Sequence, residues 1–167
     1  MQFPLHPETP PGGMLLRDLF KGRPVDIGAM QAQMKERMAA EGLPYAPQER
    51  ILNSRLAQEL SKWAESKGAH GVHDALFRAY FVDGVDISDT NALVAAAEKL
   101  GLDGAEARRV LDERTMRDAV DADWKQARSL GITGVPTFMV GKRGVVGAQP
   151  YEVLEKLVVQ SGAQRRG

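Results

Sequence analysis

The stretch Gly131-Ile132-Thr133-Gly134-Val135-Pro136-Thr137-Phe138-Met139-Val140 decides the fold class of this chain. Gly131 follows an amphipathic run and marks the end of a helix, because glycine readily adopts the left-handed conformation of a C-terminal cap. Pro136 then stands directly before a β-branched and aromatic run, which predicts a strand over 137–140. Residues 141–144 are typical of a hairpin turn leading to a second short strand at 145–146. Pro150 suits the first turn of a final helix.

Helices dominate the sequence before this stretch. Apolar residues recur there at helical spacing, and glycines close several of the runs. We expect an extended segment at 3–8, a short helix or turn at 14–20, and helices over 27–41, 53–67, 72–80, 90–100, 104–111 and 116–130. We expect Met30, Met34 and Met38, at i, i+4 and i+8, to pack in the core, together with Trp63 and Trp124. An isolated two-stranded hairpin is marginally stable unless something pairs with it or covers it.

Composition excludes several classes of function. Lysine plus arginine and aspartate plus glutamate each number 22, so the formal net charge is zero. This balance disfavours a broad nucleic-acid or anionic-membrane surface, and we expect the Arg165-Arg166 pair to be a solvated tail. We find no membrane-span or signal-peptide pattern, which predicts a cytoplasmic protein. The sequence has no cysteine, which excludes dithiol chemistry by this polypeptide alone.

An ordered set of short motifs resembles the DsbA-family proteins of the FrnE type, which are related to 2-hydroxychromene-2-carboxylate isomerases and kappa-class glutathione transferases. The matching segments are residues 3–5 with Pro7, 53–57, 76–81, 101–103, 134–138 and 147–150. The resemblance implies an α/β fold, mostly helical here, in which an incomplete thioredoxin-like domain carries a large inserted helical domain. It assigns residues 1–13 and 113–167 to the thioredoxin-like domain and residues 14–112 to the helical insert.

The same resemblance implies a substrate-binding loop. Residues 134–138 match the cis-proline loop of the family, in which the N–H and C=O of Val135 would face an extended substrate. Gly134, Val135 and Pro136 are therefore candidate substrate-binding residues. Asn53 is a fourth candidate, because the matching asparagine of glutathione-using relatives lies beside the active site. The alternatives are that Pro136 only shapes the start of the strand, and that Asn53 or Ser54 caps a helix.

The chain departs from the family pattern in the part that carries the chemistry. Family members begin with a strand, a cysteine-containing turn and a helix, and we expect this chain to be a truncated or degenerate member that lacks this unit and has no catalytic residue of its own. Many relatives also carry a histidine where this chain has Gln58. The leading hypothesis is a thiol-disulfide oxidoreductase family protein whose redox dithiol is absent from this sequence. The alternatives are a non-redox protein that binds a peptide or glutathione, and a relative of the glutathione-dependent isomerases or transferases, whose serine is missing here.

The expected partners follow from these hypotheses. We expect a peptide or protein thiol, or a glutathione-like ligand, and neither nucleic acid nor a membrane. No cofactor or metal is expected, with glutathione a candidate substrate or ligand. His70 and His73 have a spacing that can support metal binding, but without a further ligand we expect them at the surface. A homodimer or swapped assembly is expected, because loss of the missing unit would expose apolar faces of the C-terminal hairpin and helix.

Overall fold

Residues 1–164 are described by a computed structural model, in which the chain divides into two compact units. One unit combines Met1–Leu5 with the chain from Ala122 onward, and the other is His6–Asp121. The expected tail at Arg165 and Arg166 lies outside the described residues. The assignment of residues 14–112 to a helical insert stays a prediction.

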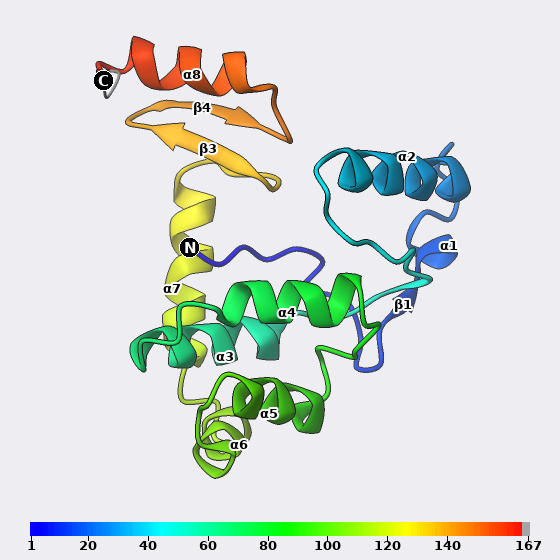
Figure 1. The fold of residues 1–167 in the computed structure, drawn as a ribbon, viewed down its shortest axis with the longest axis vertical. Helices are drawn as coiled ribbons and strands as arrows, with labels where there is room; N and C mark the ends of the chain where they lie inside the picture. Colours follow the sequence, from blue (N-terminus) through cyan, green and yellow to red (C-terminus); the bar gives the residue numbers. More distant parts are fainter. Residues whose placement is uncertain (165–167) are drawn as a thin grey trace. The chain divides into compact units, whose positions relative to one another are not determined.

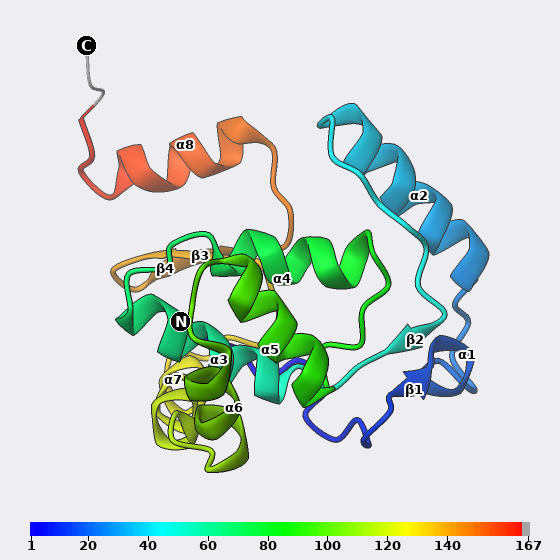
Figure 2. The same cartoon turned by 60° about the horizontal axis from the view of Figure 1, so that its bottom comes forward.

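The larger unit, His6–Asp121, is mainly helical (Figures 1 and 2). Its elements are β1 (Met14–Leu15), α1 (Leu16–Leu19), α2 (Ile27–Ala40), β2 (Arg50–Ile51), α3 (Arg55–Ser66), α4 (Val72–Phe81), α5 (Thr90–Lys99), α6 (Gly104–Asp112) and the first part of α7 (Arg117–Ser129). The two short strands pair antiparallel, with Met14 opposite Ile51. The predicted helices therefore form, while the expected helix or turn at 14–20 divides into strand β1 and helix α1.

The core of this unit lies among α3, α4, α5 and α6. Leu60, Leu93 and Leu111 are fully buried there, and Trp63 is only 2% exposed, which confirms its predicted core position. α5 begins at an aspartate cap, because the Oδ1 atom of Asp89 accepts a hydrogen bond from the first turn at 2.8 Å. Aspartate caps of this kind satisfy amide groups that no carbonyl within the helix can reach.

The prediction that the methionine stripe of α2 packs in the core is wrong. None of the α2 side chains is buried, and Met30 and Met34 are 37% and 44% exposed. The helix is attached instead by polar contacts, in which Gln31 exchanges two hydrogen bonds with the backbone of Gln48. Figures 1 and 2 draw α2 apart from the bundle of α3–α6. Helical spacing shows which side chains share a face, but not whether a neighbour covers that face.

The smaller unit is built from the C-terminal half of α7, a hairpin and α8 (Tyr151–Gln160). The hairpin strands β3 (Thr137–Val140) and β4 (Arg143–Val146) pair antiparallel, and α8 packs on them (Figure 1). The backbone N–H of Gln2 donates to the Asp123 carboxylate at 2.7 Å and fastens the first residues to α7.

Two expectations for this part of the chain need correction. Trp124 is half-buried rather than a core residue. Residues 5–8 form bends and turns rather than continuing an extended segment, and His6 has a positive φ of 50°. Four of the first eleven residues are prolines, which cannot donate backbone hydrogen bonds to a neighbouring strand. In residues 1–164, no helix combines the length and apolar character needed to cross a membrane.

Candidate functional site

The loop between α7 and β3 is held at both ends by hydrogen bonds. The Val135–Pro136 peptide bond is cis. The hydroxyl of Thr137 donates to the carbonyl oxygen of Gly134 at 2.6 Å, and the N–H of Gly147 donates to the carbonyl oxygen of Pro136 at 2.7 Å. These two bonds fix the backbone immediately before and after Val135.

Val135 itself is presented to solvent. The residue is 51% exposed, and neither its N–H nor its C=O makes a hydrogen bond to any group within residues 1–164. One fixed donor and one fixed acceptor on a residue beside a strand can pair with an extended peptide. The structure thus brings Gly134, Val135 and Pro136 together on one loop whose backbone can bind a ligand.

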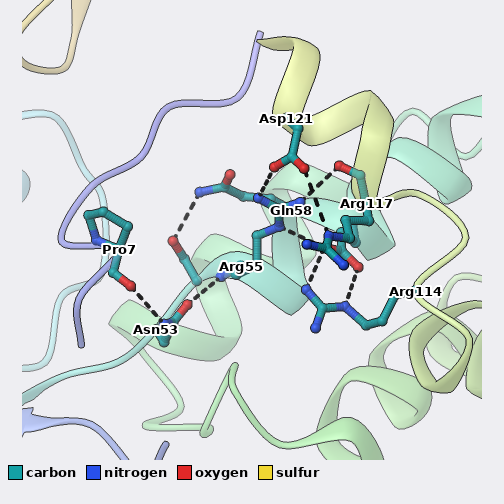
Figure 3. A network of polar contacts seen from close by, with 9 residues as sticks. Pro7, Asn53, Arg55, Gln58, Arg114, Arg117 and Asp121 are labelled. Atoms are coloured by element: carbon teal, nitrogen blue, oxygen red, sulfur yellow. Dashed lines mark hydrogen bonds and ion pairs between the residues drawn. The ribbon is translucent and has the colours of Figure 1, made fainter. Parts of the chain in front are cut away.

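Asn53 lies in the other unit, and its side chain is engaged within the protein (Figure 3). Its Nδ2 atom donates to the carbonyl oxygen of Thr9 at 2.8 Å and more weakly to that of Pro7 at 3.4 Å. Its Oδ1 atom accepts from the backbone N–H of Arg55 at 2.9 Å. Asn53 therefore forms an Asx turn that satisfies the first amide of α3 and ties the segment around Thr9 to the helix, while Ser54 is the N-cap residue and makes no side-chain cap hydrogen bond.

Next to this turn lies an ion network around a buried carboxylate (Figure 3). The side chain of Glu59 is 0% exposed; its Oε1 atom lies 2.6 Å from Nε of Arg55, and its Oε2 atom lies 2.7 Å from Nε of Arg114. A second Arg114 nitrogen also donates to Oε1 at 2.7 Å. Arg55 continues the network to the Asp121 carboxylate at 2.6 Å and to the Arg117 carbonyl oxygen at 2.8 Å.

Electrostatics make this network a structural element rather than an acid-base site. Burial acts to raise the pKa of Glu59, but the hydrogen bonds and charges of Arg114 and Arg55 outweigh it and leave that pKa below its ordinary value. A doubly bound carboxylate with a lowered pKa stays ionised near neutral pH and is a poor proton donor. Sequence reasoning missed this network. The i, i+4 spacing of Arg55 and Glu59 was the available signal.

His70 and His73, whose spacing can support metal binding, do not form a metal site with other side chains of the described residues. Nε2 of His73 lies 2.7 Å from a carboxylate oxygen of Glu65, and His70 is exposed. Within residues 1–164, no three histidine, aspartate or glutamate side chains are placed to hold a metal ion together.

Comparison with solved structures identifies the architecture. A probable DsbA oxidoreductase from Streptomyces coelicolor is similar, with a TM-score of 0.78 and 33% sequence identity; the match covers 91% of this chain and 68% of that one. A candidate protein disulfide isomerase from Nitrosomonas europaea shares the fold, with a TM-score of 0.62 and 18% identity over 81% of this chain and 74% of its own.

Sequence comparison agrees with the structural one. The uncharacterized protein YwbO of Bacillus subtilis is 35% identical over 95 residues, which cover 56% of this chain and 48% of YwbO. The match therefore spans about half the length of that relative. The predicted fold class, a thioredoxin-like fold of the DsbA type with a helical insertion, is confirmed. Because residues 1–159 match the model of the DSBA-like thioredoxin domain, this chain belongs to the DSBA-like thioredoxin domain family.

Proposed function

We propose that this chain provides the substrate-binding loop of a FrnE-type thiol-disulfide oxidoreductase, and that the reactive thiols are carried by polypeptide outside these 167 residues. The observation that carries the proposal is the loop at Val135, whose backbone is fixed on both sides while its own N–H and C=O remain available. Membership of the DSBA-like family supports the redox part. A cytoplasmic location belongs to the same proposal.

The geometry suits an extended peptide or protein substrate. The N–H and C=O of Val135 would pair with the substrate backbone, so recognition would depend little on substrate side chains. A thiolate supplied from outside this sequence attacks one sulfur of the substrate disulfide. The new S–S bond forms as the old one breaks, and the other substrate sulfur leaves as a thiolate. The loop holds the substrate backbone in place during this exchange.

The first test is the intact mass of the protein isolated from its native cell, combined with thiol labelling. A mass heavier than 18.2 kDa by about 4 kDa, the size of a strand-helix-strand unit of ~30 residues or more, together with labelled thiols, is the expected result. A mass of 18.2 kDa without disulfide-exchange activity in the purified native material would overturn the redox part.

The absence of cysteine from the sequence favours a second candidate, a non-redox protein that binds a peptide or glutathione at the same loop. Calorimetry of the 167-residue chain with an extended peptide and with glutathione tests it. Methylating the peptide nitrogen that faces Val135 should weaken binding by about 2- to 13-fold, the equivalent of one hydrogen bond. Val135→Ala keeps both backbone groups and should retain most of the affinity. Absence of saturable binding at millimolar ligand would contradict this candidate.

A further inference from the structure

An apolar groove of about 560 Å³ lies in the His6–Asp121 unit, far along the chain from the loop at Val135. It lies between the C-terminal end of α2 and the outer face of α4. The apolar side chains that line it are Met38, Leu43, Pro44, Phe77, Phe81 and Val82.

The amino-acid pattern of α4 gives the helix two different faces. Val72 and Leu76 are buried in the core, whereas Asp74, Phe77 and Arg78 line the groove on a different face. Phe77 is 60% exposed, although burying a phenylalanine side chain away from water is favourable in free energy. Besides its buried face, α4 therefore has a second face on which Phe77 stays exposed between the charged side chains of Asp74 and Arg78.

Phe77 belongs to a cluster of rings rather than standing alone at the surface. Its ring centroid lies 6.3 Å from that of Phe81 and 6.5 Å from that of His73. Phe81 in turn contacts Tyr80 edge-on at 4.7 Å and stacks with Tyr45 at 6.4 Å. Phe77 is the exposed member of this cluster, and the rings beside it are half-buried. An exposed ring that continues into an apolar groove indicates an interaction surface more strongly than an isolated exposed ring does.

The charged side chains beside Phe77 can pair with the same side chains of a second copy. Asp74 and Arg78 both line the groove and lie four residues apart, which is about 6 Å along a helix. When two copies of α4 cross antiparallel about a two-fold axis near Phe77, Asp74 faces the partner's Arg78 and Arg78 faces the partner's Asp74. We propose that this face of α4, with the groove beside it, is the contact surface of a homodimer formed with a second copy of this chain.

The side chain of Arg78 is available for such a contact. It is 66% exposed, and its Nε atom lies 4.0 Å from Asp83, at the outer limit of an ion pair within the chain. An arginine with this exposure can turn toward a partner's carboxylate at little cost. Arginine, methionine and aromatic residues are also the types enriched at the centres of protein interfaces.

The exposed methionines of α2 extend the same surface. Met38 lines the groove, and Met34 and Met30 continue from it along one face of the helix. Methionine adapts its shape to an irregular partner. In the proposed dimer, the second copy covers the methionine stripe of α2 that does not pack in the core. The stripe then forms part of the dimer contact.

Charge reversal tests the proposal, read out by sedimentation velocity over a hundredfold range of concentration. The wild-type chain should pass from 18.2 kDa to twice that mass. Asp74→Arg or Arg78→Asp alone places like charges opposite each other at two symmetric points and should raise the dimer dissociation constant about tenfold. The double variant, Asp74→Arg with Arg78→Asp, restores both pairs and should recover dimerisation. Lys99→Glu, an exposed reversal on α5, is the matched control and should change nothing.

Each other outcome overturns the proposal. A monomer at every concentration excludes a second copy as the partner. A dimer that both single reversals leave unchanged, but that Phe138→Ser dissociates, would place the contact on the C-terminal hairpin instead. Binding of an added amphipathic helical peptide to a wild-type chain that stays monomeric would assign the groove to another protein. Unchanged circular dichroism and thermal midpoints keep each variant interpretable, because Asp74 and Arg78 are exposed.

Discussion

Replacing Glu59 with glutamine tests whether the buried carboxylate holds the helical unit together. The side chain of Glu59 is inaccessible to solvent and accepts hydrogen bonds from two arginines, Arg55 on α3 and Arg114 after α6. Glutamine has nearly the same shape but removes the charge and turns one oxygen into an amide nitrogen that cannot accept. The change therefore removes electrostatic pairing without creating a cavity.

The expected cost follows from the number and exposure of these contacts. Removing one partner of a buried ion pair costs about 3–5 kcal/mol, because the other charge is left without compensation. Here Arg114 is 42% exposed and Arg55 is 15% exposed, so both guanidinium groups regain some contact with water. We therefore expect Glu59→Gln to lower the free energy of unfolding by about 2–3 kcal/mol at pH 7. The thermal midpoint should fall by about 4–12 °C.

Urea unfolding, followed by the fluorescence of Trp63, measures this change in the free energy of unfolding in the His6–Asp121 unit. Trp63 is buried in the His6–Asp121 unit, and a Trp124→Phe background removes the signal from the other unit. Glu106→Gln is the control, because Glu106 pairs with Lys67 at 2.8 Å but is 31% exposed. It should have a much smaller effect. Equal midpoints for Glu59→Gln and the background at pH 7 would refute the structural role of the network.

The pH dependence of stability gives an independent check on the role of the ionised Glu59 side chain. The folded-state pKa of Glu59 is lowered from 4.5, so the stabilisation is fully present above the unfolded-state pKa and is lost as the pH falls through the folded-state value. The stability difference between the background and Glu59→Gln should therefore be greatest near neutral pH and shrink below about pH 4.5. A difference that stays constant from pH 7 to pH 3 would contradict the lowered pKa.

Three further changes test single contacts. Gly13→Ala places a Cβ atom 2.6 Å from a backbone oxygen of β2 in a residue with φ of 79°, whereas Gly12→Ala, with φ of 77°, meets nothing. Urea unfolding should show that the first costs about 1–3 kcal/mol more than the second, and equal costs would exclude the clash. Asp89→Ala removes the cap of α5 and should cost about 1 kcal/mol in thermal unfolding, whereas Asp89→Asn should be nearly neutral. Thr137→Val removes the hydroxyl that donates to Gly134 and should weaken peptide binding several-fold in calorimetry, while Thr137→Ser should retain it.

Local signals predicted most of the helices and the hairpin. Asp89 and Asp103 cap α5 and α6 at the starts of two predicted helices, and Gly131 follows the helix that it was expected to end. These features depend on groups a few residues apart, so the sequence contains them directly. The position of the α2 methionines could not be predicted in this way, because their exposure depends on which other elements pack nearby.

The site illustrates the same distinction. Val135 and Gly134 could be singled out because residues 134–138 resemble the cis-proline loop of the DsbA family, and that resemblance is visible in the sequence. The network around Glu59 could not be predicted, because Arg114 lies 55 positions from Glu59 along the sequence. Arg114 also has an unusual positive φ of 55°. A long-range ion pair leaves no local pattern, and only its i, i+4 member, Arg55, could have suggested it.

Thiol-disulfide exchange has a binding half, which holds the substrate, and a chemical half, which breaks and forms S–S bonds. The two halves require different residues. Holding an extended substrate requires main-chain N–H and C=O groups in a fixed place, and any residue type except proline can supply both. Val135 offers such groups, between hydrogen bonds to the carbonyl oxygens of Gly134 and Pro136. Exchanging a disulfide requires a cysteine thiol, which the 167 residues lack. A chain can therefore keep the binding half of the reaction without the chemical half. If native protein with additional thiols loses exchange activity when the bond to Gly134 is removed by Thr137→Val, while its thiols still react with a small disulfide, the binding half will have been separated from the chemistry experimentally.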